Sequence, residues 1–289
     1  MRLVTYRSER GDRAGVLHGD RVVDAWDALD GEGQSVRDLL VAGGLSDLTA
    51  AIFPGGGENG RIGAERAAAV GDVALLAPIP DPEKIVCIGL NYRGHAAEAG
   101  QEVPTSPTVF GKYRNALAGP GATVALPAAS SKVDYEAEIA FVVGRRAKEV
   151  GEGEGLAHIA GYMLLNDLSA RDLQFATQQW MAGKVFDGSA PCGPALVTAD
   201  EVGAPDSIEF ALDLNGERMQ ESSTADLIFP MHTLVSELSR LMTLEPGDIV
   251  STGTPAGVGS MREPQVWLAP GDEMVITSPQ LGELRTTVS

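Results

Sequence analysis

The 289-residue sequence is informative first through what it lacks. No stretch approaches about 18 uninterrupted apolar residues, so we expect no transmembrane helix. The N-terminal residues carry charges and no apolar run, which predicts that no signal peptide is present. No Gly-x-Gly-x-x-Gly follows a strand-like segment and no phosphate-binding loop occurs, so the sequence predicts no nucleotide cofactor.

Cysteine is also scarce. The only two cysteines, Cys87 and Cys192, lie far apart and have no Cys-x-x-Cys partner. This spacing argues against a disulfide framework and against a structural zinc site. We therefore expect two buried free thiols in a reducing compartment, and we predict a cytoplasmic protein.

Basic residues are few, with 22 Lys and Arg against 40 Asp and Glu and a formal net charge of −18. A chain this acidic repels phosphate backbones and anionic lipids, so we expect no nucleic-acid and no membrane partner. An anionic small-molecule substrate is compatible with this charge only if a metal or a few placed cations reverse the local field. Five of the basic residues are lysines, at positions 84, 112, 132, 148 and 184.

The sequence divides into two unequal parts. Residues 1–72 predict a small N-terminal α+β domain, with a strand–turn–strand at 16–23 and a helix capped by Ser35. A proline-rich connector at 73–82 separates it from a larger domain at 83–289. The glycine-rich run at 55–60 predicts a loop.

Beyond the connector, segments of high β-propensity alternate with turn clusters. They predict strands at 84–89, 138–143, 248–251 and 273–277, and a helix at 231–242. Many strands with few helices indicate a β-rich α+β fold rather than a doubly wound sheet.

Two glutamates stand out on a predicted strand at 134–143. Alternate residues share a face, so Ala137, Ile139 and Phe141 face a core while Glu136 and Glu138 project together from the other face. Like charges at about 6–7 Å repel in partial burial unless a cation intervenes. A hard divalent cation with oxygen ligands would resolve this conflict, and a solvated strand face is the alternative.

Asp167 follows a predicted apolar strand at 159–166. The next residues predict a helix with Ser169 as N-cap and Asp172 three positions later. Asp167 can therefore ligate a metal or merely cap the helix. Arg171 and Gln174, three residues apart, share one helix face.

Three further segments carry candidate chemistry. Lys184 lies in a glycine- and aromatic-rich segment and is either functional or a surface lysine. His95 and Glu98 are spaced i, i+3, so a short helix would pair the imidazole with a carboxylate that orients it, in a water-activating or simply exposed pair. The hydroxyl- and glycine-rich loop at 251–259 would let backbone N–H groups approach an anion.

In this order, the segments resemble the fumarylacetoacetate hydrolase (FAH) family, in its two-domain bacterial type. The resemblance covers about residues 80–289. It rests on six motifs: Gly-Leu-Asn-Tyr-x-x-His-x-x-Glu at 89–98, Pro-Thr-Val-Phe-Gly-Lys at 107–112, Asp-Tyr-Glu-x-Glu at 134–138, Asn-Asp-x-Ser-Ala-Arg-Asp-x-Gln at 166–174, Lys-x-Phe-Asp at 184–187, and Thr-Gly-Thr-Pro-x-Gly-Val-Gly at 252–259.

The resemblance implies a mixed β-sandwich roll at 83–289 beside the small N-terminal domain, and a homodimer. It implies that Glu136, Glu138 and Asp167 bind Mg²⁺ or Mn²⁺, with Ca²⁺ as a further candidate. Some members supply a fourth carboxylate ligand, for which this sequence offers no match, so we expect three carboxylates plus waters.

The resemblance also implies the catalytic and substrate-binding residues. His95 and Glu98 match the pair that activates water or moves a proton, and Lys184 matches an active-site cation. We assign substrate binding to Tyr92, Arg171, Gln174, Thr252, Gly253 and Thr254.

The implied reaction is a metal-dependent hydrolysis of a C–C bond in an acylpyruvate-type 1,3-diketo 2-oxo acid, through an enolate. Decarboxylation of an oxaloacetate-type acid and a hydroxymuconate-type isomerisation would use the same site. A non-catalytic ligand-binding relative is a further alternative.

Overall fold

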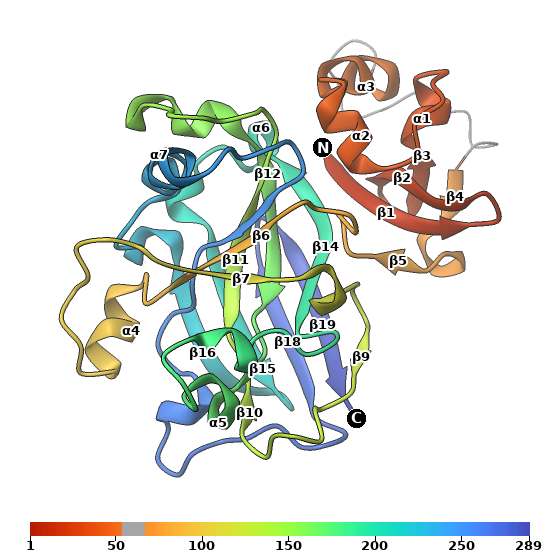
Figure 1. Cartoon of the computed structure of the whole chain (residues 1–289). Helices are drawn as coiled ribbons and strands as arrows, with labels where there is room; N and C mark the ends of the chain where they lie inside the picture. The colour runs from red at the N-terminus through yellow and green to blue at the C-terminus, as the bar shows by residue number, and fades with distance from the viewer. Residues whose placement is uncertain (54–66) are drawn as a thin grey trace.

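The computed structural model describes residues 1–53 and 67–289 (Figure 1). The loop predicted at 55–60 lies outside these residues. Among the helices that are described, none is both long and apolar enough to cross a membrane.

The N-terminal part is an antiparallel meander covered by short helices. The predicted strand–turn–strand is confirmed as β2 and β3, with Gly19 at a φ of +59° in the turn between them. The predicted helix cap is also confirmed, because Ser35 and Asp38 form a capping box at the start of α2. The elements are β1 (Arg2–Ser8), β2 (Gly11–His18), β3 (Arg21–Asp24), α1 (Ala25–Ala28), α2 (Val36–Val41), α3 (Leu45–Ile52), β4 (Ala67–Ala69) and β5 (Leu75–Leu76).

One large mixed sheet connects this part to the rest of the chain. Its order is β4-β3-β2-β1-β14-β12-β11-β17-β6-β7, with β5 beside β1 and β8 beside β14. The junction is the antiparallel pair β1–β14. The further strands are β6 (Ile85–Gly89), β7 (Thr108–Lys112), β8 (Leu117–Ala118), β11 (Ala137–Val143), β12 (Ile159–Asn166), β14 (Ala190–Thr198) and β17 (Ile249–Ser251).

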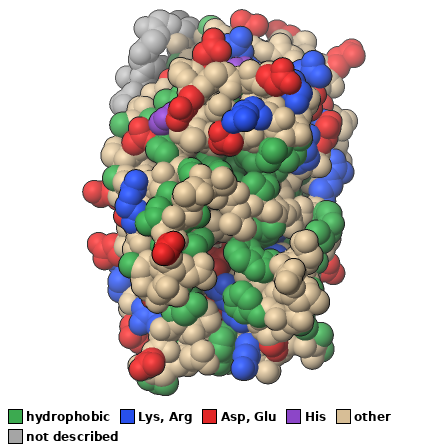
Figure 2. Space-filling model, turned by 60° about the vertical axis from the view of Figure 1, so that its left-hand side comes forward, with side chains coloured by type: hydrophobic (Ala, Val, Ile, Leu, Met, Phe, Trp, Pro, Cys, Tyr) green, Lys and Arg blue, Asp and Glu red, His purple; other side chains and the backbone are tan. Residues whose placement is uncertain are grey.

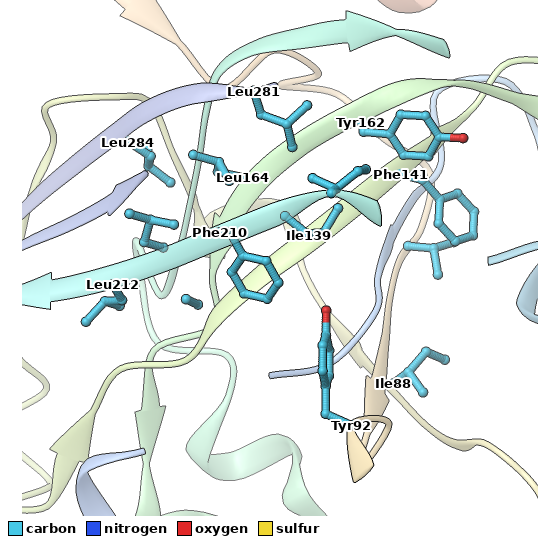
Figure 3. Packing of buried hydrophobic residues seen from close by; sticks show 14 of the residues in the cluster. Ile88, Tyr92, Ile139, Phe141, Tyr162, Leu164, Phe210, Leu212, Leu281 and Leu284 are labelled. Atoms are coloured by element: carbon cyan, nitrogen blue, oxygen red, sulfur yellow. The ribbon is translucent and has the colours of Figure 1, made fainter. Parts of the chain in front are cut away.

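A second, five-stranded sheet packs on the large one in the order β16-β15-β18-β19-β9. Buried side chains from both sheets form one cluster, in which Ile139 and Leu164 face Phe210 and Leu284 (Figure 3). The strands are β9 (Thr123–Val124), β15 (Glu209–Leu214), β16 (Glu217–Ser223), β18 (Glu273–Ser278) and β19 (Gly282–Val288), and a separate pair joins β10 (Val133–Asp134) to β13 (Ser169–Ala170).

The central strands β11 and β12 are buried on both faces. Their other face contributes Ala140, Val142 and Met163 to a second cluster that also contains Leu39 of α2 and Leu48 of α3. Polar groups at the ends of these strands therefore lie at the edge of a deep core. The predicted β-rich α+β class is confirmed.

Short helices complete the fold. They are α4 (Arg93–Glu98), α5 (Arg171–Gln174), α6 (Ala199–Val202) and α7 (Met231–Leu241), the last within the predicted 231–242. Acidic and basic side chains are interspersed on the face shown in Figure 2, and hydrophobic side chains gather in its middle. On that face the acidic side chains are therefore mixed with basic ones and do not form a uniformly negative surface.

Candidate active site

Three carboxylates meet where β11 begins and β12 ends. Ala137 pairs with Asn166 in the β11–β12 ladder, and the Asp167 N–H donates to the Glu136 carbonyl oxygen at 2.8 Å. This register brings Glu136, Glu138 and Asp167 together, with one carboxylate oxygen of each within 4.8 Å of the others. All three side chains are buried.

Two lysines and an arginine bind two of these carboxylates. The Lys184 ammonium bridges Glu136 Oε2 at 2.6 Å and Asp167 Oδ2 at 2.7 Å. Arg171 Nη2 donates to Glu136 Oε1 at 2.6 Å, and Lys112 Nζ donates to Asp167 Oδ1 at 2.7 Å. Burial opposes ionisation of Glu136, but Arg171 and Lys184 hold its pKa far below its usual value.

Glu138 has no such partner. Its Oε2 accepts hydrogen bonds from the Ser251 hydroxyl and from the Gly253 N–H, and in residues 1–53 and 67–289 no cation forms a salt bridge with it. Burial, together with the nearby charges of Asp167 and Glu136, raises the pKa of Glu138 to about 8. Its negative charge is therefore poorly compensated.

Counted formally, the buried charges of the site leave one negative charge in excess. The four carboxylates are Asp134, Glu136, Glu138 and Asp167, and the three cations are Lys112, Arg171 and Lys184. A divalent cation would reverse the sign and suit an anionic ligand. Carboxylate oxygens are the donors that hard cations prefer, so these residues fit Mg²⁺ or Mn²⁺.

Arg171 is held by several partners at once. Its Nε donates to Asp134 Oδ1 at 2.6 Å, and its Nη1 donates to Gln174 Oε1 at 3.0 Å, on the helix face that the two residues were expected to share. Asp134 also accepts from the Ser260 N–H at 2.8 Å. Arg171 therefore orients Glu136 as well as lining the cavity described below.

The predicted cap of this helix is wrong. Helix α5 begins after Ala170, which provides no side-chain cap, and Ser169 belongs to β13, where it pairs with Asp134. The Ser169 hydroxyl donates instead to the Asp167 carbonyl oxygen at 2.8 Å. Ser169 therefore pairs in a strand, although the local sequence pattern assigns it to the start of the helix.

His95 and Glu98 form the predicted pair on α4. His95 Nδ1 lies 3.1 Å from Glu98 Oε2, and Glu98 Oε1 accepts from the Gly257 N–H at 2.9 Å. Burial acts against ionisation of Glu98, but the hydrogen bonds from His95 and Gly257 lower its pKa. The ionised carboxylate can then orient the imidazole toward the cavity that His95 lines.

A cavity of about 160 Å³ lies over these groups. Glu136, Glu138, Arg171 and Lys184 line its polar end. An aromatic wall begins beside them, where the Lys184 ammonium lies 5.1 Å from the ring centre of Phe110. The wall continues to Trp180, whose ring meets Phe110 edge-on with the ring centres 5.7 Å apart.

The predicted substrate-binding residues divide into two groups. Arg171, Gln174 and Thr254 line the cavity, whereas Tyr92, Thr252 and Gly253 are not among its lining residues. Thr252 donates to the Ile139 carbonyl oxygen at 2.7 Å, and the Gly253 N–H binds Glu138. The anions that this loop approaches are thus the protein's own carboxylates.

Tyr92 lies in the core instead of the cavity. Its side chain is fully buried and meets Phe210 edge-on with ring centres 6.0 Å apart (Figure 3). Its hydroxyl has no hydrogen-bond partner in the described part of the chain.

Sequence reasoning missed the contributions of several residues. Lys112 was only part of a motif, although a scarce lysine at the end of an apolar strand was a usable signal. The roles of Asp134 and Ser251 carried no comparable signal, because their partners Arg171 and Glu138 lie 37 and 113 residues away.

Residues 84–289 match the family described as fumarylacetoacetate (FAA) hydrolase, C-terminal. The chain belongs to this family. It is 43% identical over 213 residues to the mitochondrial oxaloacetate tautomerase FAHD2B of Bos taurus, covering 73% of this chain and 68% of that protein. It is 38% identical to the FAH domain-containing protein 2 homolog of Dictyostelium discoideum, covering 100% of this chain and 97% of that protein.

Solved structures of the family share the whole fold. The 5-carboxymethyl-2-hydroxymuconate delta-isomerase of Mycobacterium smegmatis has a TM-score of 0.78 at 32% identity, covering 100% of this chain and 99% of that chain. The maleylpyruvate hydrolase of Sphingobium sp. SYK-6, in complex with manganese(II) and pyruvate, has a TM-score of 0.80 at 29% identity, covering 100% and 98%. The family therefore includes tautomerases, isomerases and hydrolases.

Proposed function

We propose that this protein is a divalent-metal-dependent enzyme that forms the enolate of a small 2-oxo acid, and that its reaction is the keto–enol tautomerisation of oxaloacetate or a close analogue. The observation that carries the proposal is the poorly compensated charge of Glu138 inside a three-carboxylate cluster, beside a cavity that is also lined by His95, the partner of Glu98.

The cavity supports a small anionic substrate. Pockets for drug-sized ligands measure about 300–1,000 Å³, and the 160 Å³ here suits a metabolite of a few carbons. Glu136, Glu138 and Asp167 would hold the divalent cation. When bound, such a cation supplies Lewis-acid stabilisation of negative charge on a 2-oxo oxygen.

The protein's own groups then move the proton. His95 takes a proton from C3 of the keto form and returns it to the enolate oxygen, so that no other reactant is needed. Glu98, fixed by the Gly257 N–H, keeps the imidazole oriented. The Lys184 ammonium adds positive charge beside the reacting oxygens.

Hydrolysis of an acylpyruvate is the second candidate. The His95 side chain is 12% exposed, so water can reach the imidazole, as a hydrolase requires. We rank tautomerisation above hydrolysis, the reaction expected first from the sequence, because the tautomerase relative is 43% identical and the maleylpyruvate hydrolase 29%. Oxaloacetate decarboxylation is the third candidate.

The test follows the ultraviolet absorbance of enol-oxaloacetate with Mg²⁺ or Mn²⁺, and with a chelator. Parallel assays measure acetylpyruvate hydrolysis and pyruvate release from oxaloacetate. We expect metal-dependent tautomerisation that His95→Ala lowers by about 10²–10⁴-fold. His158→Ala is the matched control, because the His158 ring lies 3.2 Å from the Arg145 carbonyl oxygen and is not among the residues that line the cavity. Full tautomerase activity in the chelated protein would refute the proposal.

A further inference from the structure

Each carboxylate of the cluster has one oxygen held by a protein donor other than Lys184. Arg171 holds Glu136 Oε1, and Lys112 holds Asp167 Oδ1. The Ser251 hydroxyl and the Gly253 N–H both hold Glu138 Oε2. The other oxygens of Glu136 and Asp167 contact the Lys184 ammonium, so a cation can take one oxygen from each residue once that ammonium moves aside.

The more deeply buried of the two ionic restraints is the pair Lys112–Asp167. Both side chains have 0% exposure, and Lys112 does not line the cavity. The Lys112 ammonium also donates to the backbone carbonyl oxygen of Lys184, which accepts the Ser189 hydroxyl at 2.9 Å as well. The ammonium is thus fixed from behind the site, at the end of β7.

Turning Asp167 so that both oxygens face a cation would break this charge-assisted bond and leave a buried ammonium with one partner fewer. Breaking a buried ion pair is strongly unfavourable. Glu138, by contrast, is held by a hydroxyl and an amide, which are neutral donors and give way more easily.

We propose that Lys112 is a positioning residue that restricts Asp167 to one-oxygen ligation, and that it thereby makes the site select Mg²⁺ or Mn²⁺ over Ca²⁺. Ca²⁺ takes six to eight oxygens and readily accepts two from one carboxylate, whereas Mg²⁺ demands a small octahedral set. The inference rests on the proposed function, because it assumes that the cluster binds a divalent cation.

The experiment measures the dissociation constants of Mn²⁺ and Ca²⁺ for the metal-stripped full chain by calorimetry. Removing a positive charge shifts both affinities alike, because both ions are divalent, so the ratio of the two constants isolates the geometric effect. We expect Lys112→Met to shift this ratio toward Ca²⁺ by about tenfold, the usual scale for residues that orient a ligand.

Lys84→Met is the matched control. Lys84 binds the buried carboxylate of Asp248 at 2.8 Å, and it precedes β6 at the end of that strand opposite Gly89, which lines the cavity. We expect the ratio to be unchanged in this variant. An equal shift in both variants would overturn the role of Lys112.

The remaining outcomes separate the two proposals. Parallel changes in both affinities of Lys112→Met, at a constant ratio, would overturn the selectivity role and leave the metal site intact. Absence of binding of either ion to the wild-type chain would overturn both proposals. If Lys112→Met does not fold, a crystal structure of the Mn²⁺-loaded wild type decides: Asp167 bound through one oxygen supports the role, and Asp167 bound through two overturns it.

Discussion

Two buried charge clusters in this molecule differ in how completely they are compensated. In the N-terminal part, the Asp24 carboxylate accepts from Arg13 through two bonds of 2.8 Å, from Arg10 at 3.1 Å and from the Tyr6 hydroxyl at 2.9 Å. Two backbone N–H groups of α1 complete its shell. In the candidate active site, Glu138 has two neutral donors and, among residues 1–53 and 67–289, no salt-bridge partner.

The pKa values of Asp24 and Glu138 are therefore shifted in opposite directions, although burial opposes ionisation of both. Burial opposes ionisation of Asp24, but Arg13 and the backbone N–H groups lower its pKa. Burial and neighbouring carboxylates raise the pKa of Glu138. A buried charge network that is complete within the chain needs no ligand, whereas one that lacks a counter-charge is suited to receive a cation.

The largest expected effect comes from neutralising the poorly compensated charge. Glu138→Gln should abolish metal-dependent activity and weaken Mn²⁺ binding by more than about 100-fold, since even residues that only orient a ligand change metal affinity by 10–100-fold. The metal-free variant should melt at the same temperature as the wild type or higher, because repulsion among the carboxylates is relieved. Calorimetric titration and thermal melts measure the two effects, and unchanged Mn²⁺ affinity would remove Glu138 from the site.

Neutralising the compensated charge should have the opposite profile. Asp24→Asn leaves the buried Arg13 with only the more exposed Asp27, at 3.3 Å, as a counter-charge, so we expect a loss of about 3–5 kcal/mol in the free energy of unfolding. Mn²⁺ affinity of the folded protein should not change. Urea denaturation measures the loss, with Asp12→Asn as control, because Asp12 pairs with Arg7 in an exposed bridge. If Asp24→Asn is as stable as the wild type, the Asp24 cluster does not depend on its charge compensation, and the proposed difference between the two clusters is wrong.

The pH dependence of stability sharpens the same contrast. The raised pKa of Glu138 means that the metal-free folded chain keeps a proton up to pH about 8, whereas the unfolded chain releases it near pH 4.3. For this group, stability should therefore be highest below pH 4.3, and it should fall by about 3–4 kcal/mol as pH rises from about 5 to 8. The lowered pKa of Asp24 acts only at lower pH, where acidification removes its contribution.

Saturating Mn²⁺ should remove this slope, as should Glu138→Gln. Urea melts of the metal-free protein between pH 5 and 8 provide the measurement. Stability that rises with pH across this window, in wild type and variant alike, would contradict the prediction.

How far the sequence predicted these clusters depends on the separation of the partners. The period-two pattern placed Ala137, Ile139 and Phe141 in the core, and all three lie there, because neighbours on one strand are set by local geometry. The His95–Glu98 contact spans one helical turn. These features follow from patterns within a few residues.

The rest of the network joins residues that are distant in sequence. Lys112 lies 55 residues before Asp167, and no local pattern pairs residues that far apart. The Ser169 prediction failed for the same reason, since a strand distant in sequence pairs with that residue. Tyr92 is part of the motif at 89–98, which predicts a substrate contact, but strand and helix geometry turns its ring into the core.

Tyr92 provides the smallest expected effect and tests whether an unsatisfied buried group alone marks a functional site. Among the described residues its hydroxyl is buried without a hydrogen-bond partner, as a ligand-binding group would be, but it is uncharged and its ring packs against Phe210 (Figure 3). Tyr92→Phe removes a desolvated hydroxyl, so we expect stability to stay the same or rise by about 1 kcal/mol. Activity and Mn²⁺ affinity should match the wild type. A drop in kcat or a rise in KM in this variant would show that the hydroxyl contacts the substrate. In that case an unsatisfied buried hydroxyl, and not only an uncompensated buried charge, would mark the active site.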